Sequence, residues 1–351
     1  MVPLSKAWVM TTSIPWMAMA WNSPAEAQEW IEVDTAEAPP PRGFHVMAYD
    51  RIRDVAMLFG GIGEDQEVLG DTWVFKDDVW RSAESPAAPR ARIWSAAAFD
   101  EERGVVVLFG GFGAGFLDDT WTWDGTTWTE LAPATRPPAR YGHALAFDRA
   151  RQVLLLVGGY STTGAVEDAW AWDGSQWALL DSGATRPDAR YWHGAATTDD
   201  GVLVFAGLGS DNETWLWDGA AWAVSGGETS PPARHTYALA GDRIALLHGG
   251  NEGLGDTWEW DGAWREVTST ASPGSRAGST LVGDGTGSFL LFGGGADGDA
   301  FGDLWRYHPS ATDQPLGTPT GCGCGSQTTG LPIALAALAL VAIRRKWRCA
   351  R

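Results

Sequence analysis

The sequence predicts an all-β protein in which a unit of four antiparallel strands is repeated around a ring. Three observations lead to this prediction: a repeat of 43 to 50 residues marked by glycine pairs, an apolar strand before each pair, and tryptophan-rich strands after it. The pairs end at Gly61, Gly111, Gly159, Gly250 and Gly294, with a single Gly207 in the fourth of six copies. Repeats of this length and texture are typical of the blades of a β-propeller.

An arginine begins each copy and precedes the two innermost strands. The six arginines are Arg42, Arg92, Arg140, Arg190, Arg234 and Arg276. Residues 143–148 (HALAFD) are a representative first strand, and residues 105–111 (VVVLFGG) include a representative second strand. The nearly continuous apolar character of the second strand predicts burial on both faces. The glycines that follow allow unusual backbone angles or a close approach to a neighbouring segment.

The third and fourth strands are marked by tryptophan. A variable loop leads to Asp-Thr-Trp at residues 71–73, 119–121 and 256–258, and variants of this motif begin at Asp168, Glu213 and Asp303. The motif WDGxxW follows, as in residues 123–128, and Asp-Gly between alternating strands is a strong hairpin signal. Four antiparallel strands per copy make one propeller blade. We expect these tryptophans to be wedges within or between blades.

The two ends of the repeat region predict how the ring closes. The last copy has no second tryptophan and no fourth strand after Arg306. Trp30, in the segment EWIEVD at residues 29–34, lies twelve residues before Arg42, and the other fourth-strand tryptophans precede the next arginine by 12 or 13 residues. We therefore predict that residues 29–34 pair with the strand around residues 304–307. This pairing would remove an open sheet edge.

Paired glycines after an apolar strand, followed by a tryptophan at a fixed distance, resemble the kelch family. The resemblance extends over about residues 29–309 and departs from the pattern at Ala206-Gly207 in copy four. It implies a six-bladed kelch β-propeller at residues 28–309, with an N-terminal strand closing the last blade. A kelch-type copper oxidase is excluded, because it needs a tyrosine cross-linked to cysteine and this region has none.

Composition narrows the classes of function. The net charge is −19, so a nucleic-acid partner, which needs a basic face, is not expected. The three cysteines are Cys322, Cys324 and Cys349, which leaves residues 1–321 without a disulfide, a thiolate metal site or a cysteine nucleophile. No cofactor is expected.

Both ends of the chain resemble targeting segments. Residues 1–27 predict a signal peptide, with Lys6, an apolar stretch at residues 7–21 and an A-x-A pattern that places cleavage after Ala27. Residues 310–329 predict a linker that carries Cys322 and Cys324. Residues 330–351 predict a short transmembrane helix and a basic tail that begins at Arg344 and Arg345.

The order of cysteine motif, apolar helix and basic cluster resembles the myxobacterial C-terminal sorting signal. The resemblance implies recognition by a membrane sorting protease near the cysteines, followed by display at the cell surface. The helix then anchors the protein in the membrane or is removed by processing. The predicted location is therefore outside the cytoplasm, at the cell surface.

The six arginines are also the first candidates for a binding site, because in the kelch family their position lies near one mouth of the central channel. With aromatic neighbours such as Phe44, Tyr141, Tyr191 and His235, they could hold a carboxylate or a sulfated sugar. The alternative is that each arginine forms an ion pair with an Asp or Glu of its own repeat. The Asp of the Asp-Thr-Trp motif could instead accept hydrogen bonds from loop backbone.

Other candidates are weaker. His45, His143 and His193 recur at one position and could bind a metal, and Asp297, Asp299 and Asp303 could hold Ca²⁺ in a loop. The preferred function is non-catalytic binding of a protein or carbohydrate through the variable loops before Asp-Thr-Trp. The alternative is a secreted propeller enzyme acting on glycans, which would need a carboxylate pair that the sequence cannot identify.

Overall fold

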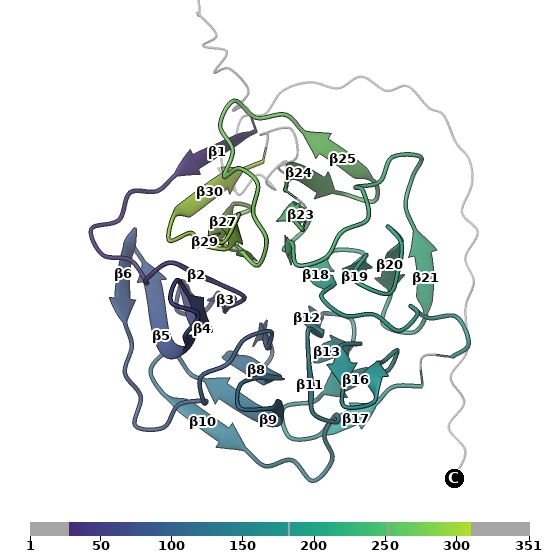
Figure 1. The fold of residues 1–351 in the computed structure, drawn as a ribbon. Coiled ribbons are helices and arrows are strands. Elements are labelled where there is room, and N and C mark those ends of the chain that lie inside the picture. The colour runs from purple at the N-terminus through teal and green to yellow at the C-terminus, as the bar shows by residue number, and fades with distance from the viewer. Residues whose placement is uncertain (1–27, 182, 252, 310–351) are drawn as a thin grey trace, which may run out of the picture. The chain divides into compact units, whose positions relative to one another are not determined.

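The computed structural model of the protein describes residues 28–309 except residues 182 and 252. These residues form strands and no helix, and their strand pairings are antiparallel. Five sheets have four strands, one has five, and two small sheets have three and two. The six larger sheets lie around a central axis (Figure 1). The prediction of an all-β, antiparallel fold is therefore confirmed.

The two inner strands of each large sheet follow the repeat arginine. The first strands are β3 (Val46–Asp50), β7 (Ala96–Asp100), β12 (Ala144–Asp148), β18 (Gly194–Thr198), β22 (Ala238–Gly241) and β26 (Thr280–Gly283). The second strands are β4 (Val55–Gly63), β8 (Val105–Phe112), β13 (Val153–Val157), β19 (Gly201–Phe205), β23 (Ala245–Gly250) and β27 (Phe289–Phe292). Each second strand pairs with the first strand of its own copy, as the sequence predicts.

The two outer strands carry the tryptophan motifs. The third strands are β5 (Val68–Lys76), β9 (Phe116–Trp123), β16 (Ala169–Trp172), β20 (Thr214–Trp217), β24 (Leu254–Trp260) and β30 (Leu304–His308). The fourth strands are β6 (Val79–Ser82), β10 (Trp128–Leu131), β17 (Trp177–Leu179), β21 (Trp222–Ser225), β25 (Trp264–Val267) and β1 (Glu29–Glu32). Short strands are β2 (Arg42–Gly43), β11 (Arg140–Tyr141), β14 (Tyr160–Ser161), β15 (Gly164–Ala165), β28 (Gly295–Ala296) and β29 (Asp299–Ala300).

The Asp-Gly turns close the outer hairpins as predicted. In the second sheet, Asp124 accepts hydrogen bonds from the backbone N–H groups of Thr126 and Thr127 at 2.9 and 2.8 Å. Gly125 has φ 97°, a conformation that glycine adopts without strain. The turn fixes the register in which Trp128 lies opposite Trp123.

The N-terminal strand completes the last sheet. β1 pairs with β30, with Trp30 opposite Tyr307 and Ile31 opposite Arg306. Trp30 is almost fully buried in an apolar cluster that includes residues of the fifth and sixth copies. The prediction that residues 29–34 pair with the strand around residues 304–307 is confirmed, with the paired strand ending at Glu32. Because of this pairing, the last sheet contains both the first and the last strand of the described chain.

Apolar packing joins each large sheet to its two neighbours. The first strands contact one another in a closed circle, in which β26 of the last copy meets β3 of the first. Each of six core clusters combines residues from two adjacent sheets, as Met47 and Leu58 combine with Val282 and Leu290. Fully burying one such side chain stabilises the fold by about 1.5–3 kcal/mol. No sheet covers both of its faces without its neighbours, as expected of a repeat protein.

The glycine pairs allow neighbouring sheets to approach closely. A Cβ atom at Gly293 would lie 2.6 Å from the carbonyl oxygen of Arg42. The next residue, Gly294, donates its N–H to that same oxygen at 2.9 Å. Gly60 and Gly61 stand in the same relation to Arg92. The pairs therefore serve contacts between copies and not only the turn that follows the second strand.

Most fourth-strand tryptophans bind a threonine of the preceding copy. Trp128 donates its Nε1–H to Thr72 Oγ1 at 2.9 Å, and three equivalent bonds join Trp30 to Thr257, Trp177 to Thr120 and Trp264 to Thr214. Trp80 and Trp222 are buried without a partner for Nε1 among the described residues. At their acceptor positions the chain has Leu304 and Ala169 in place of threonine. The predicted wedge role of these tryptophans is confirmed by their burial.

Candidate functional site

In five of the six copies, the buried repeat arginine forms the same type of cluster with an Asp and a Trp of its own copy. Arg140 donates from Nη1 and Nη2 to both carboxylate oxygens of Asp168, at 2.5 and 2.9 Å. Its Nη1 and Nε also donate to the backbone oxygens of Gly158 and Pro138. Asp168 accepts a further hydrogen bond from Trp170 Nε1 at 2.8 Å. The equivalent ion pairs are Arg42–Asp71, Arg92–Asp119, Arg234–Asp256 and Arg276–Asp303.

These contacts leave the arginines unavailable to an external anion. The side chains of Arg42, Arg92, Arg140 and Arg234 are fully buried, and those of Arg190 and Arg276 are 1% and 2% exposed. Burial by itself raises the pKa of Asp168, but the hydrogen bonds and positive charge of Arg140 outweigh burial and hold this pKa below its usual range. Of the two alternatives for the arginines, the structure shows the ion pair within the repeat. The anion site expected at these six residues therefore has no free guanidinium group.

The fourth copy has a weaker version of the cluster. Arg190 Nη2 is 3.5 Å from one oxygen of Glu213, and the side chain of Glu213 is 44% exposed. Burial lowers the pKa of Arg190, and the charge of Glu213 opposes this effect only in part. Ala206 replaces the first glycine of the pair and has φ 42°. Copy four therefore combines a longer acidic side chain, Glu213 in place of Asp, and the loss of a glycine with a longer ion-pair distance.

A ring of backbone hydrogen bonds surrounds one mouth of the central channel. It is formed by the second residue after each repeat arginine: Phe44, Trp94, Gly142, Trp192, Thr236 and Gly278. Each N–H in this ring donates to the carbonyl oxygen of the equivalent residue in an adjacent copy, at 2.7 to 3.3 Å, and the ring closes from Phe44 to Gly278. All six have φ between 54° and 67°, which is unfavourable for a bulky residue. Sequence reasoning missed this ring because its members differ in type.

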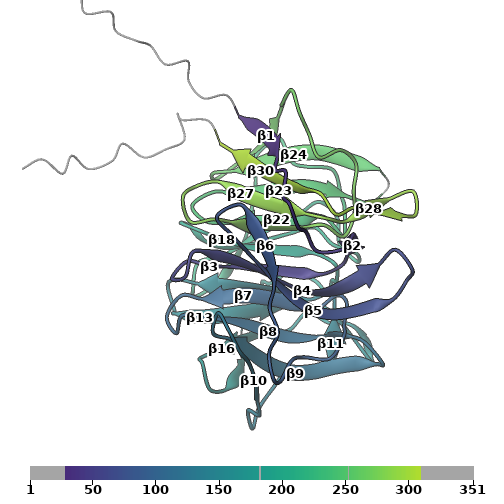
Figure 2. The same ribbon diagram turned by 90° about the vertical axis from the view of Figure 1, so that its left-hand side faces the viewer.

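Large aromatic side chains cover this mouth and extend over the adjacent loops. The "aromatic surface" consists of nine partly exposed rings: Phe44, Trp94, Phe112, Phe116, Tyr141, Tyr160, Tyr191, Trp192 and His235. Each ring contacts at least one other, with centroids 4.9 to 6.4 Å apart. The hairpins between β4 and β5 and between β28 and β29 project from one side of the ring (Figure 2). The loops that contribute Phe112 and Tyr160 occupy the equivalent place in their own copies.

The aromatic surface departs from the symmetry of the repeat. Copies two to four contribute seven of its nine rings, whereas the sixth copy has Ala277, Gly278 and Gly295 at the corresponding positions. Sequence analysis named Tyr141, Tyr191, Phe44 and His235 individually, and Phe112, Phe116 and Tyr160 lie in the variable loops through which it expected binding; it missed Trp94 and Trp192. Both missed rings lie two residues after a repeat arginine, so comparing the copies position by position would have found them.

A family model identifies the repeat independently. The model described as the KLHDC2/KLHL20/DRC7 Kelch-repeats domain matches residues 19–207, which is more than half of the 351 residues. The chain is a kelch-repeat protein. No curated protein matches the sequence. The matched region ends at Gly207, but the Arg-Asp-Trp clusters of Arg234 and Arg276 beyond it have the same geometry as those within it.

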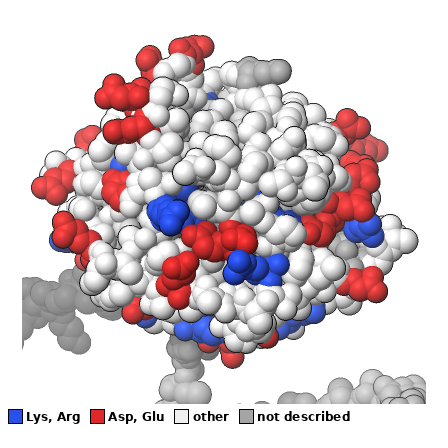
Figure 3. Space-filling model, turned by 60° about the horizontal axis from the view of Figure 1, so that its bottom comes forward, with Lys and Arg blue, Asp and Glu red and all other residues white. Residues whose placement is uncertain are grey.

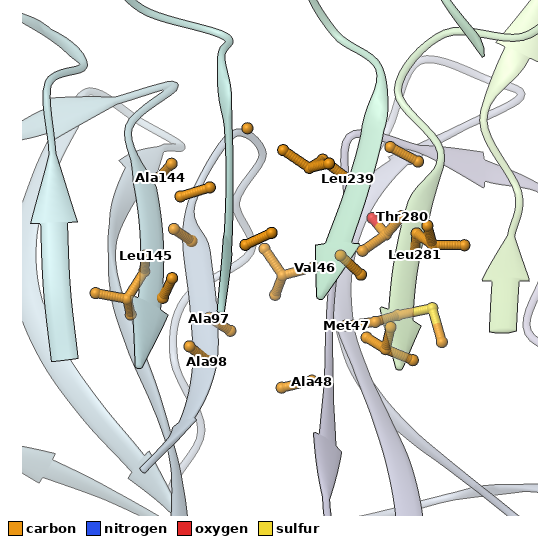
Figure 4. Close-up of a pocket in the computed structure, with 18 of the residues that line it drawn as sticks. Val46, Met47, Ala48, Ala97, Ala98, Ala144, Leu145, Leu239, Thr280 and Leu281 are labelled. Atoms are coloured by element: carbon orange, nitrogen blue, oxygen red, sulfur yellow. The ribbon is translucent and has the colours of Figure 1, made fainter. Parts of the chain in front are cut away.

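The kelch repeats enclose a channel of about 270 Å³. Side chains of the first strands line it, including Val46, Leu145 and Leu239 (Figure 4). At the end opposite the aromatic surface, Arg51 and Arg149 bind Asp242, and Arg149 also binds Glu101, at 2.9 to 3.4 Å. Burial alone lowers the pKa of Arg149, but its hydrogen bonds to Glu101 and the charge of Glu101 raise this pKa further than burial lowers it. The channel therefore has an aromatic end and an ionic end.

The three repeated histidines of the kelch domain lie in the core. His45, His143 and His193 are buried, and His143 packs edge-on against Phe109 of the preceding copy. Burial, assisted by the nearby repeat arginine, lowers the pKa of each to about 3, so these rings are neutral at pH 7. No group of three or more His, Cys, Asp or Glu residues able to hold a metal occurs in the part of the chain that the structure describes. In the loop with Asp297 and Asp299, Asp303 is bound to Arg276.

The predicted targeting residues fall outside the described part of the kelch protein. These are the signal peptide with Ala27, the linker with Cys322 and Cys324, and the apolar segment with Arg344 and Arg345. Among the described residues, no helix is long and apolar enough to cross a membrane.

Proposed function

We propose that this kelch-repeat protein is a six-bladed β-propeller that binds a protein or carbohydrate ligand without catalysing a reaction. The ligand-binding face is the aromatic surface. One observation carries the proposal: nine contiguous, partly exposed rings lie on the loop side of the repeats and are concentrated in copies two to four. Tyrosine and tryptophan are enriched in the energetically dominant parts of interfaces, because they offer a large and rigid contact area.

The repeated polar groups support a binding role over a catalytic one. The aspartates that recur in five copies are held by buried arginines and tryptophans, as Asp119 is by Arg92 and Trp121. A glycosidase needs two carboxyl groups that are free to act as acid and as base or nucleophile. Among the described residues that line the channel, Glu101 is the one carboxylate, and it is bound to Arg149.

We further propose that the kelch domain is exported and displayed at the cell surface. The support is the order of segments in the sequence: a signal peptide ending at Ala27, then the repeats, then Cys322 and Cys324, an apolar stretch and the basic Arg344 and Arg345. A sorting protease would act near the cysteines, and the helix or its processed product would attach the protein to the membrane. Protease digestion of intact cells tests this location. The double variant Cys322→Ser/Cys324→Ser should lose surface exposure, and unchanged exposure would contradict the sorting role.

Binding is tested with the full chain on a glycan array and in a pull-down of surface proteins. The double variant Phe116→Leu/Tyr160→Leu removes two rings from loops and leaves the repeat arginines untouched. We expect at least a tenfold loss of affinity for any ligand that wild type retains. Tyr49→Leu is the matched control, because Tyr49 is partly exposed on the opposite side of the ring. Turnover of a glycan, or binding that both variants retain equally, would contradict the proposal.

A further inference from the structure

We infer that the ligand of the aromatic surface is cationic: a peptide segment that carries arginine or lysine side chains. The inference rests on the proposed function, since it takes the aromatic surface as the binding face and adds the charge of the ligand. It follows from the charges around the surface and from the chemistry of the rings.

The loops around the aromatic surface are acidic and contain no basic residue. They comprise the connection between the second and third strands of each copy together with adjoining strand residues, at residues 62–70, 112–118, 160–167, 207–213, 251–255 and 295–302. None of these segments has a lysine or an arginine. Their described carboxylates are Glu64, Asp65, Glu67, Asp118, Glu167, Asp211, Glu213, Asp297 and Asp299. Such a bias in sign gives this side of the protein a negative potential, which attracts cations and repels anions.

The nearby cations do not neutralise these loops. The six repeat arginines are buried and already paired within their own copies. Arg136 binds Asp118 at 2.9 Å, and Arg186 binds Glu167. Arg90 is exposed beside the first two loops and forms no ion pair with a described residue, so it opposes their charge only in part. Glu64, Asp65 and Glu67 are exposed and form no ion pair with any residue that the structure describes. The same holds for Asp211, Asp297 and Asp299, so most of the negative charge is available to a ligand.

The charged groups surround uncharged surface. Figure 3, which turns the lower edge of Figure 1 toward the viewer, shows a broad uncharged area in its upper half, with carboxylates at the left and right margins and a mixed group of carboxylates and Lys or Arg side chains below it. Interfaces typically have this arrangement of an uncharged centre and a charged rim. A cation bound at the centre would therefore have carboxylates around it and few competing positive charges.

The rings themselves suit a cation. Phe116, Tyr141 and Tyr160 form a nearly parallel row, with centroids 5.3 and 5.4 Å apart and planes tilted by 29° and 25°. The hydroxyls of Tyr141, Tyr160 and Tyr191 have no hydrogen-bond partner among the described residues, and each can accept a bond from an N–H donor. An aromatic face attracts ammonium and guanidinium groups, and guanidinium also stacks on it. A neutral glycan would stack on the rings and could donate hydroxyl hydrogen bonds to the carboxylates, but it would gain no attraction between opposite charges.

The extent of the surface favours a peptide over a small cation. Its rings come from five of the six copies and form one connected set from Phe44 to His235. A single ammonium group occupies only one or two rings, within about 6 Å of each centroid. A chain with several cationic side chains would cover more of the rings and reach more of the acidic loops.

Three labelled ten-residue peptides test the inference with the full chain. They share one Gly-Ser sequence and carry three arginines, three glutamines or three glutamates. Fluorescence anisotropy should show the arginine peptide binding at least tenfold more tightly than the glutamine peptide, no binding of the glutamate peptide, and weaker binding at high salt. Phe116→Leu/Tyr160→Leu should weaken the arginine peptide at least tenfold, whereas Tyr160→Phe, which keeps the ring, should weaken it less than threefold.

The acidic loops are tested by a matched pair of variants. Glu64→Gln/Asp65→Asn/Glu67→Gln should weaken the arginine peptide three- to tenfold. Glu29→Gln/Glu32→Gln/Glu130→Gln changes the net charge equally on exposed outer-strand positions and should leave binding within twofold.

Any result other than those expected overturns the inference of a cationic ligand. Some of these results are still compatible with the proposed binding function. Equal binding of the arginine and glutamine peptides, or binding of a neutral glycan alone, overturns the cationic ligand but supports a binding role if it needs Phe116 and Tyr160. If binding of the arginine peptide weakens at high salt but is unchanged in Phe116→Leu/Tyr160→Leu, it reflects general attraction to an acidic protein. This result also overturns the inference. No binding of any peptide also overturns it. Ligand binding that never depends on the aromatic rings overturns the proposed function as well.

Discussion

Arg140 and Tyr141 are adjacent in the chain, yet they belong to two regions with opposite properties. Arg140 is fully buried, and its ion pair recurs in the other copies. Tyr141 is partly exposed, and its position is occupied by Tyr191 and His235 in copies four and five but by Gly43, Ile93 and Ala277 in the other three. The comparison teaches that what the copies share stabilises the ring, whereas what they do not share forms the surface. Substitutions in the two regions should therefore change different measurements.

The largest expected difference between the two regions is in the effect of low pH on stability. The buried histidines lie in the shared core of the repeats and not on the aromatic surface. The pKa of His45, His143 and His193 is lowered to about 3, whereas in the unfolded chain each titrates near 6.5. The unfolded chain therefore binds more protons between these values, and stability is full above pH 6.5 and lost as the pH falls toward 3. Each histidine contributes a slope of up to about 1.4 kcal/mol per pH unit. Urea unfolding at pH 7.5, 6 and 5 measures this loss.

The histidine variants have a control within the repeat, because Ser95 and Ser279 occupy the equivalent position in copies two and six. His143→Ser lowers stability at pH 7.5 by opening space against Phe109, but it should also reduce the pH slope by one histidine. Tyr160→Leu should leave the slope unchanged. A slope that is the same in His143→Ser and wild type would show that this buried ring does not carry the pH effect.

The buried ion pair should give the next largest effect. Arg140→Met keeps the length of the side chain but leaves Asp168 without its partner, and breaking a buried pair costs about 3–5 kcal/mol. Phe116→Leu on the aromatic surface should cost less than about 1 kcal/mol, because the ring is partly exposed. Denaturant unfolding of both variants makes the comparison. A similar loss in both would mean that the aromatic surface is part of the scaffold.

The fourth copy sharpens the comparison within the scaffold itself. Asp256→Asn removes one charge from a bidentate pair at 2.7 Å and should cost about 2–4 kcal/mol. Glu213→Gln makes the same change where the contact to Arg190 is single, 3.5 Å long and more exposed, and should cost less than about 1 kcal/mol. Urea midpoints of the two variants test this difference. Equal losses would mean that the longer contact of Arg190 does not weaken its pair.

Repetition also explains how far the sequence alone could lead. The glycine pairs, Asp-Gly turns and Trp30 recur with fixed spacing, and from them the strands, the antiparallel sheets and the pairing of β1 with β30 could be predicted. The candidate site could be predicted only in part. Tyr141 and Tyr191 lie on it, but the repeat arginines next to such positions form ion pairs with carboxylates about 20 to 30 residues later in the chain. Composition and spacing do not reveal which side chains a fold leaves without a partner.

The smallest predicted effect concerns a position where the scaffold departs from its own pattern. Trp222 is buried, and its Nε1 has no partner among the described residues, because Ala169 stands where Thr120 accepts the equivalent bond from Trp177. Ala169→Thr restores an acceptor on a strand that favours β-branched residues, and should raise the free energy of unfolding by about 1 kcal/mol. The reverse change, Thr120→Ala, should lower it by about 1–3 kcal/mol, since it leaves Trp177 without an acceptor. Slower exchange of the Trp222 indole proton in Ala169→Thr would verify the new bond. If Ala169→Thr gains no stability while Thr120→Ala loses it, the site at Ala169 is too tightly packed to admit the hydroxyl, and the alanine is part of the local packing.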